Sequence, residues 1–337
     1  MRILKRMDNC MGSFLNEEKP VVLGVDIGAT KILVGYVESD GIVPLSRRYV
    51  IDRSNRGSTI ASIKKAITDF LEIPWSMHPP LAIGVGLPGL INATAGTWEQ
   101  ATNLPITSPV NLAAQLIEIY KLPVALDNDV HAATLAELHL GAGLQTRDFI
   151  YLNVGTGIST GIVCNGQLVR GANNCAGEFG HTSVDMNGVA CECGGHGCLE
   201  PIASGGGILA QIRTLLPAYP TSSLGKLLEP DQLTASLVFH AADNGDSLAI
   251  EVSERAVKTL GFALINLITL LNPSLIICGG GVMADGWMIR KVDNYIATHA
   301  LPFVYQSLHG IVLSELKADQ VGLLGASILA WKSIGKT

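Results

Sequence analysis

Two stretches of the sequence repeat one pattern, and this repeat limits the possible folds more than any other feature. The first is VVLGVDIGATKILVGYVESDGIV at 21–43, and the second is FIYLNVGTGISTGIVCNGQLV at 149–169. Each has an apolar run, a glycine-containing turn, a second apolar run and a hairpin dipeptide, Asp40-Gly41 or Asn165-Gly166. The pattern predicts two equivalent strand–turn–strand units in two related domains that face each other. Two unrelated hairpins are the alternative.

Strands alternate with helices along the rest of the chain. Apolar residues recur at helical spacing in several segments, and other apolar runs are bounded by glycine, proline or polar turns. This alternation predicts an α/β fold, and 337 residues suffice for two domains of ordinary size. The expected helices are 58–71, 109–120, 130–140, 208–216, 236–242, 248–271 and 321–331, and the expected strands outside the repeat are 81–91, 124–129, 275–282 and 310–316.

The composition argues against several classes of partner. The formal net charge is -6, which leaves no basic excess to neutralise phosphates, so we expect no nucleic-acid partner. The longest apolar stretch, 260–271, is shorter than the ~20 residues of a membrane-spanning helix, so we expect no membrane partner. Residues 1–20 lack the apolar core of a secretory signal and are expected to form a flexible tail. An odd cysteine count, seven, indicates a reducing cytoplasm.

Three glycine turns follow apolar runs and suit phosphate or nucleotide. Residues 26–31 read DIGATK, 155–157 read GTG, and 279–281 read GGG. Glycine exposes backbone N–H groups, while threonine and lysine add hydroxyl and ammonium donors. Asp26 stands at an expected strand end, where it could orient Mg²⁺. Neither of the first two turns has the P-loop spacing, and each turn alone is equally typical of an ordinary hairpin or strand-to-helix connection.

Acids and amides cluster in two places. Residues 126–129, LDND, end an expected strand and open a helix, at the strand edge where α/β folds bind ligands. Asp127 or Asn128 could instead cap the helix. The second place contains Glu178 in GEFGH and Glu200 after the last clustered cysteine. Such acids can hold sugar hydroxyls, and solvated surface acids are the alternative.

Three cysteines follow the GEFGH histidine at the spacing of a metal site. His181, Cys191, Cys193 and Cys198 supply the full set for a closed tetrahedral Cys₃His zinc site, which has no open position for chemistry and is therefore structural. A redox switch is the alternative, although Cys-x-Cys differs from the Cys-x-x-Cys of thioredoxin-like motifs. His196 could compete as ligand, but it lies between two ligands in a tight loop, which favours His181.

Together these motifs resemble the ROK family, named for repressors, open reading frames and sugar kinases. The motifs are LGVDIGATK, GVGLPGLIN, ATNLP, LDNDVHAATLAE, NVGTGISTGIV, GEFGH, CECGGHGCLE and LIICGGGV, and the resemblance runs from about Val21 to the end. It implies a two-domain, actin-like ATPase fold of the hexokinase and ribonuclease H type, with a central cleft. We place the N-terminal domain at 21–128, with residues 321–337 packed on it. The C-terminal domain then spans 129–320 and contains the zinc loop 181–198.

The resemblance also implies ATP-dependent phosphorylation of a hexose at its 6-hydroxyl, with Asp129 as the base. The expected cofactors are ATP with Mg²⁺ and a structural Zn²⁺. The implied sugar contacts are Asn103, Asn128, Glu178, His181 and Glu200. The implied ATP contacts are Gly28, Thr30, Gly155, Thr156, Gly280 and Gly281, to which the turn chemistry adds Asp26 and Lys31, and the implied zinc ligands are His181, Cys191, Cys193 and Cys198.

The sequence departs from the common ROK pattern at three places. His131 stands where many members have asparagine, Asn92 where aspartate is common, and Ser159-Thr160 where glycines are frequent. These departures leave the identity of the sugar open. We expect glucose, while N-acetylglucosamine, N-acetylmannosamine and allose kinases share the motifs.

A non-catalytic, sugar-sensing regulator is the alternative from another class. Repressor members carry an N-terminal winged helix, and the stretch before Val21 has no helix–turn–helix pattern. We therefore expect the kinase, and we expect it to be a homodimer or homotetramer.

Overall fold

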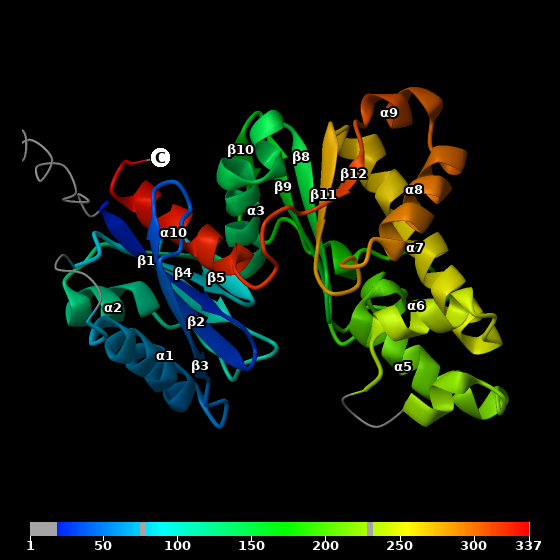
Figure 1. The fold of residues 1–337 in the computed structure, drawn as a ribbon, viewed down its shortest axis with the longest axis horizontal. Helices are drawn as coiled ribbons and strands as arrows, with labels where there is room; N and C mark the ends of the chain where they lie inside the picture. Colours follow the sequence, from blue (N-terminus) through cyan, green and yellow to red (C-terminus); the bar gives the residue numbers. More distant parts are fainter. Residues whose placement is uncertain (1–18, 75–78, 228–231, 337) are drawn as a thin grey trace, which may run out of the picture.

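Two sheets with the same strand arrangement form the framework of the protein. The computed structural model describes residues 19–74, 79–227 and 232–336, and within them each large sheet has five strands. The N-terminal sheet has the order β3-β2-β1-β4-β7 and the C-terminal sheet β10-β9-β8-β11-β12. In both, an antiparallel hairpin continues into parallel strands. The repeat in the sequence is therefore a repeat in the fold, and the expected α/β class is confirmed (Figure 1).

The strands agree with the apolar runs and are shorter than them. The N-terminal sheet contains β1 (Val21–Ile27), β2 (Lys31–Glu38), β3 (Leu45–Val50), β4 (Ile83–Leu87) and β7 (Val124–Asn128). The C-terminal sheet contains β8 (Phe149–Val154), β9 (Ile158–Cys164), β10 (Gln167–Val169), β11 (Leu275–Gly279) and β12 (Ile311–Leu313). The strand expected from Leu81 ends at the Pro-Gly turn as β4, and a small hairpin of β5 (Leu90–Asn92) and β6 (Thr97–Gln100) follows that turn.

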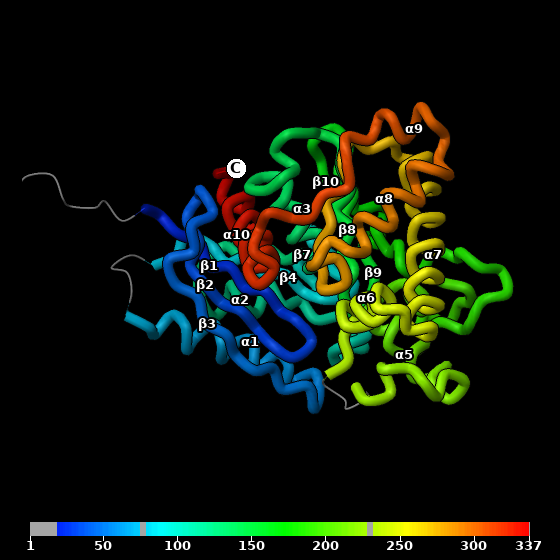
Figure 2. The backbone as a smooth tube through the Cα atoms, turned by 45° about the vertical axis from the view of Figure 1, so that its right-hand side comes forward, coloured from blue at the N-terminus to red at the C-terminus, as the bar shows by residue number. Residues whose placement is uncertain are grey.

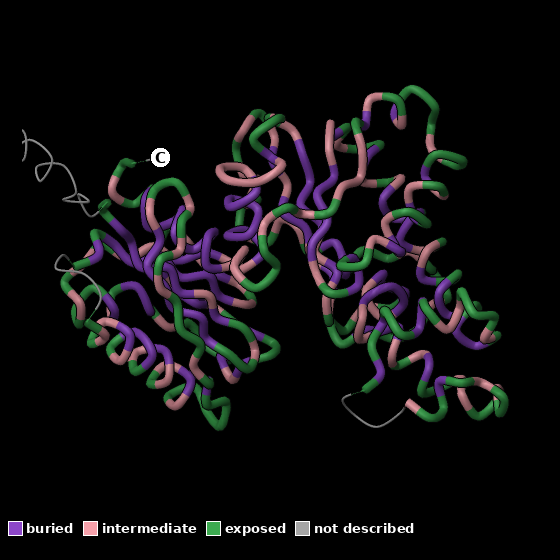
Figure 3. Tube along the Cα trace, in the orientation of Figure 1, coloured by how far each residue is buried: buried purple, intermediate pink, exposed green. Residues whose placement is uncertain are grey.

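Helices cover both faces of each sheet. The longer helices are α1 (Arg56–Leu71), α2 (Leu112–Tyr120), α3 (Asp129–Leu140), α5 (Gly205–Leu215), α6 (Ala235–Asp243), α7 (Ser247–Leu271), α8 (Trp287–His299) and α10 (Val321–Ser333), and the short ones are α4 (Glu200–Ala203) and α9 (Pro302–Ser307). Such coverage explains why β1, β4 and β8 are almost continuously buried (Figure 3).

The N-terminal sheet lies between two helical layers. Helices α1 and α2 pack on one face through a core that includes Phe70 and Leu116. Helix α10, the last in the chain, packs across β1 and β4 on the other face (Figures 1 and 2). The C-terminal helix thus lies against the first sheet although the second sheet precedes it in sequence.

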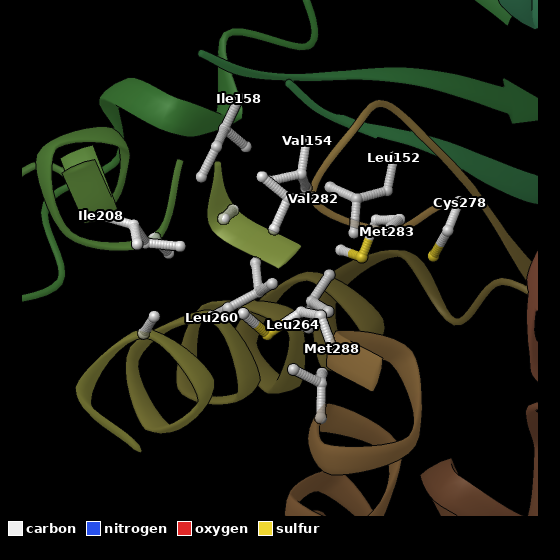
Figure 4. Packing of buried hydrophobic residues seen from close by; sticks show 14 of the residues in the cluster. Leu152, Val154, Ile158, Ile208, Leu260, Leu264, Cys278, Val282, Met283 and Met288 are labelled. Carbon is white, nitrogen blue, oxygen red and sulfur yellow. The ribbon is translucent and has the colours of Figure 1, made fainter. Parts of the chain in front are cut away.

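The C-terminal sheet has the larger core. Strands β8 and β11 present Leu152, Val154 and Cys278 to helices α5, α7 and α8, where Leu264 and Met288 fill the interior (Figure 4). Burial of these apolar side chains is the main favourable contribution to the stability of this half. Its other face packs on α3, through a separate cluster.

Helix α3 therefore lies between the two sheets. It contacts α10 on the side of the N-terminal sheet and β8 and β9 on the side of the C-terminal sheet. Every residue from Val130 to Glu137 is buried, so the helix has no solvent-facing stripe. Its N-terminus, at Asp129, lies at the carboxyl end of β7 and thus at the edge where both sheets meet.

Two further expectations concern membrane association and the N-terminal tail. In the described residues, no helix combines the length and the apolar content that a membrane span requires. The expected tail at 1–20 lies almost wholly outside the described residues, which begin at Lys19.

Candidate active site

Two carboxylates lie together at the carboxyl edge of the N-terminal sheet. Asp26 is near the end of β1 and Asp129 directly follows β7, with Gly86 of β4 between the two strands. A Cβ atom placed on Gly86 would lie 3.8 Å from the Asp26 Oδ1 atom and 3.8 Å from the Asp129 Cα atom. The absence of a side chain at Gly86 therefore leaves the space between the two acids open.

The environment of this pair favours the protonated forms. Burial raises the pKa of Asp26 from 3.8 to about 6. Burial also raises the pKa of Asp129, and the charge of Asp26 raises it further, to about 7. Both effects disfavour a second negative charge in a desolvated site. An acid with such a pKa is a better proton acceptor at neutral pH than an exposed aspartate.

Asn128 has the capping role that the sequence left open. Its side-chain Oδ1 accepts hydrogen bonds from the backbone N–H groups of Val130, at 2.9 Å, and His131, at 3.1 Å. Its Nδ2 donates to the carbonyl of Gly89 at 3.0 Å. Asn128 thus fixes the start of α3, and thereby the position of Asp129. Its role as a sugar contact stays a prediction.

Each of the two repeated glycine turns is closed by a backbone hydrogen bond from its first glycine, across three residues in the first turn and two in the second. Gly28 N–H donates to the Lys31 carbonyl at 2.9 Å, and Gly155 N–H donates to the Gly157 carbonyl at 2.9 Å. Thr30, Lys31 and Thr156 are exposed in these turns. Equivalent turns at equivalent places in two sheets are what a ligand held between them requires.

The third glycine turn lies directly beside the second. Gly279 pairs with Asn153 of β8, and Val282 N–H donates to the Val154 carbonyl at 3.0 Å. Gly280 has φ +88°, and a Cβ there would lie 2.3 Å from the Val154 carbonyl oxygen, so only glycine fits. Gly281, like Gly155, has no neighbouring atom within 4 Å of a placed Cβ. The two turns therefore present adjacent, open backbone surfaces.

The sequence analysis missed a further part of this surface. The N–H groups of Gly205 and Gly206, at the start of α5, donate to the carbonyls of Gly155 at 2.8 Å and Thr156 at 3.1 Å. The signal was the run GGG after Ser204, whose hydroxyl caps the helix by accepting from Gly207 N–H. The first turn of α5 thereby fixes the backbone of the turn at 155–157 through two hydrogen bonds.

The four proposed zinc ligands form one cluster. One ligand atom from each of His181, Cys191, Cys193 and Cys198 can be chosen so that all lie within 4.8 Å of one another. The His181 Nδ1 atom is 3.7 Å from the Cys191 Sγ atom, and the Sγ atoms of Cys193 and Cys198 are 3.7 Å apart. A tetrahedral Zn–S bond of ~2.3 Å gives S···S separations of ~3.8 Å, so the spacing fits zinc. His196 is not a member of the cluster.

The cluster joins two loops that carry acidic residues. His181 ends the 3-10 turn Phe179–His181, and Cys198 pairs with Ser183 across an isolated bridge. Glu200 follows at the start of α4, and its Oε2 accepts a hydrogen bond from Ile158 N–H at 2.8 Å. Glu200 thus links the cluster to the turn at 155–157, a contact that the sequence did not predict.

The remaining implied sugar contacts are exposed. Glu178 precedes the 3-10 turn, and Asn103 lies in the segment that the bridge between Ala101 and Ile106 closes. Within the described residues neither side chain has a hydrogen-bond partner, and each role in sugar binding stays a prediction.

Comparison with known proteins identifies the family. A model of the ROK family matches residues 22–333. The chain belongs to the ROK family. The actin-like α/β fold that its motifs imply is therefore confirmed, since solved ROK kinases share it across most of the chain.

ROK proteins of both functional classes are similar to this chain. It is 35% identical over 292 residues to a glucokinase of Halalkalibacterium halodurans, covering 84% of this chain and 87% of that protein. It is 29% identical over 317 residues to a xylose repressor of Caldicellulosiruptor bescii, covering 92% and 78%. The ROK glucokinase of Streptomyces griseus, solved with glucose and AMPPNP, has a TM-score of 0.78 and 28% identity, covering 93% of this chain and 99% of that one.

The acid pair of this ROK protein predicts a specific dependence of stability on pH. An unfolded aspartate has a pKa of ~3.9, whereas Asp129 has about 7 in the folded chain. The folded state thus binds more protons between these values, so stability decreases as pH rises through that window. Without Mg²⁺, Asp129→Asn should melt about 3 °C or more above wild type at pH 8, since ~1 kcal/mol corresponds to roughly 2–4 °C, and the difference should shrink toward pH 5.

Thermal melts at both pH values test this expectation, with Asp69→Asn as control, since Asp69 is a partly exposed acid of α1 that pairs with Lys65. The control should change the melting temperature equally at pH 5 and pH 8. A difference between Asp129→Asn and wild type that does not grow with pH would contradict the raised pKa of Asp129.

Proposed function

We propose that this chain is an ATP-dependent hexose kinase that phosphorylates the sugar 6-hydroxyl. The observation that carries the proposal is the pair of partly exposed acids Asp26 and Asp129 at the sheet edge, whose raised pKa values reflect desolvation, in a fold whose second sheet supplies adjacent glycine turns. Similarity to ROK glucokinases supports the same reaction class. Glucose is the first candidate substrate for the same reason, and N-acetylhexosamines and allose are the others.

In the proposed reaction Asp129 orients the 6-hydroxyl and accepts its proton. The sugar oxygen forms a bond to the γ-phosphorus of ATP, the bond from that phosphorus to the bridging oxygen breaks, and ADP leaves with the electron pair. Because phosphoryl transfer is loose, the proton leaves late and orientation of the hydroxyl is a large part of the catalysis. Mg²⁺, when bound, neutralises phosphate charge, and Asp26 is the residue placed to orient it.

The glycine turns supply the proposed nucleotide contacts. Gly28 and Thr30 face the phosphates from the first sheet, and Gly155 and Thr156 face them from the second. The open backbone at Gly280-Gly281 suits the nucleoside. A ligand held by both sheets would bring the sugar and the γ-phosphate together and exclude water.

We also propose that the Cys₃His cluster binds structural zinc and that the chain divides into domains at 21–128 and 129–320. The ligand spacing supports the first point. The two sheets with their separate cores support the second, and the packing of α10 on β1 and β4 supports the assignment of 321–337 to the N-terminal domain.

A panel of sugars with ATP tests the proposal. We expect ADP formation with at least one hexose, and we expect glucose to have the highest kcat/KM, with N-acetylglucosamine, N-acetylmannosamine, mannose, fructose and allose lower. 6-Deoxyglucose is the matched control, since it retains the ring hydroxyls but lacks the nucleophile. It should inhibit competitively without being phosphorylated.

The competing function is a sugar-binding regulator without turnover, which similarity to the xylose repressor favours. In that case calorimetry would detect binding of a sugar while no sugar supports ADP formation. That combination of results would overturn the kinase.

A further inference from the structure

The loop that carries Glu178 is held by a closed ring of hydrogen bonds. This loop, residues 170–178, runs from the end of β10 to the turn Phe179–His181. At its base, Ala176 N–H donates to the Arg170 carbonyl at 3.0 Å. The Arg170 Nε donates to Asp127 Oδ2 at 3.0 Å, which joins the loop to β7 of the other sheet. Two of the contacts in the ring are thus a backbone hydrogen bond within the loop and the ion pair between Arg170 and Asp127.

His131 closes the ring from α3. Its Nδ1 lies 3.1 Å from Asp127 Oδ1, and its Nε2 lies 3.1 Å from the Ala176 carbonyl oxygen. Both facing atoms are acceptors, so an N–H of the imidazole ring is the donor in each of these contacts. The side chain is 3% exposed, so water does not substitute for either contact.

Asp127 is the buried anchor of this ring. Burial raises its pKa, but the hydrogen bond from His131 and the charge of Arg170 outweigh that effect and leave the pKa below its ordinary value. The carboxylate is fully buried, and it also accepts from Asn128 N–H at 2.9 Å. An ionised, buried carboxylate with directional partners gives the loop a fixed attachment point.

Thr160 holds the next peptide of the same loop. Its backbone N–H donates to the Gly177 carbonyl at 2.8 Å, and its hydroxyl lies 3.2 Å from the same oxygen. Gly177 has φ +103°, and a Cβ there would lie 1.9 Å from the Thr160 carbonyl oxygen. The contact therefore depends on glycine at 177, and the hydroxyl at 160 adds a second, longer bond to the one from the backbone.

His131 and Thr160 hold the same loop from two elements that are distant in sequence. His131 comes from α3 and Thr160 from β9, yet they bind consecutive carbonyls, Ala176 and Gly177, directly before Glu178. An asparagine at 131 has a shorter side chain with a single donor group, so it cannot bond Asp127 and Ala176 in the same way. A glycine at 160 has no hydroxyl.

We propose that His131 and Thr160 are positioning residues that fix the loop 170–178 and so determine how strongly and how selectively Glu178 binds the sugar. The inference rests on the proposed kinase function. The ring joins β7 and α3 to the loop 170–178, so it sets the distance between the base Asp129 and the acid Glu178. A loop that is ordered before binding adds affinity because its entropy is not lost on binding, and it discriminates better between epimers.

Kinetics of His131→Asn, Thr160→Gly and the double variant test the positioning role. We expect the KM for the preferred hexose to rise about tenfold in each single variant, with the KM for ATP within twofold and kcat within about threefold of wild type. The preference for that hexose over its C2 epimer should decrease. His299→Asn, a solvent-exposed histidine at the end of α8, is the matched control and should change neither KM. An unchanged sugar KM, or an equal loss in kcat and in both KM values, would overturn the proposal.

Hydrogen exchange separates this proposal from the proposed function. Amides of residues 171–178 should exchange about tenfold faster in His131→Asn than in wild type, with or without any kinase activity. Unchanged exchange of these amides would overturn the proposal that His131 fixes the loop 170–178. The wild-type protein could phosphorylate no sugar while His131→Asn still speeds exchange in the loop. That result would overturn the kinase function and support the role of His131 in fixing the loop.

Discussion

Asp129→Asn should lower kcat for sugar phosphorylation by about 10²–10⁴-fold, the range typical for removal of a general base. The amide keeps the shape of the side chain and its place at the start of α3, but it cannot accept the proton of the 6-hydroxyl. Binding of sugar and of ATP should stay within a fewfold of wild type, because Asn128 still caps the helix and the glycine turns are untouched.

Initial rates at saturating sugar and ATP, with calorimetry of sugar binding, make this test decisive. Asp69→Asn, on α1 outside the site, should retain wild-type kcat. If Asp129→Asn retains more than about a tenth of the wild-type rate, the loss falls below the range expected of a general base and Asp129 is not that base.

Sequence reasoning predicted best the features that depend on local pattern. The repeated strand–turn–strand units at 21–43 and 149–169 became the hairpins of two equivalent sheets. Glycine turns are also predictable from the local sequence, because glycine is the residue that readily adopts positive φ and lets another group approach the backbone closely. The turns at Gly155 and Gly280 were found individually, although their adjacency depends on the pairing of β8 with β11.

Elements with weak local signals were missed. Strand β3, LSRRYV, is an exposed edge strand with hardly any buried side chain, so no apolar run identifies it. Helix α8, WMIRKVDNYIATH, buries Trp287, Met288, Val292 and Ile296, which is helical spacing, but charged and polar residues occupy most other positions. Its mean hydropathy therefore resembles that of a surface segment.

Contacts between residues far apart in the chain could not be predicted from the sequence. Nothing in LDNDVHAA indicates that His131 binds a carbonyl 45 residues away, or that Asp127 pairs with Arg170. Similarly, Glu200 was expected to touch only the sugar, and its bond to Ile158 appears only when α4 and β9 are packed together. Single-sequence patterns specify residue chemistry, whereas such contacts depend on the relative placement of two sheets.

Cys193→Ser should remove bound zinc and raise the sugar KM about tenfold or more, since loss of one thiolate leaves an open, weaker site. Cys193 is exposed, so the substitution makes no cavity in the core. Its expected effect therefore comes from the metal. The loop between His181 and Cys198 would then be held by hydrogen bonds such as Val184 N–H to the Gly197 carbonyl, at 2.8 Å, and the Ser183 hydroxyl to the His196 carbonyl, at 3.4 Å.

The effect on the sugar follows from what the cluster joins. Zinc would connect His181, three residues after Glu178, to Cys198, two residues before Glu200, so its loss removes one support from both acids at once. The ATP turns at 26–31 and 279–281 lie outside this loop, and the turn at 155–157 keeps its bonds from Gly205 and Gly206, so the KM for ATP should stay within twofold. The melting temperature should also fall, because metal binding to the folded state contributes folding free energy.

Cys175→Ser is the matched control, as Cys175 is exposed and lies outside the cluster. Metal analysis should find about one zinc per chain in wild type and in this control, the ratio of a single closed site, and little in Cys193→Ser. Full zinc retention in Cys193→Ser would contradict the assigned ligand set. Loss of zinc with an unchanged sugar KM would instead show that the metal stabilises the loop without positioning Glu178 or Glu200. The two effects are separable because zinc content and sugar KM are measured on the same preparation.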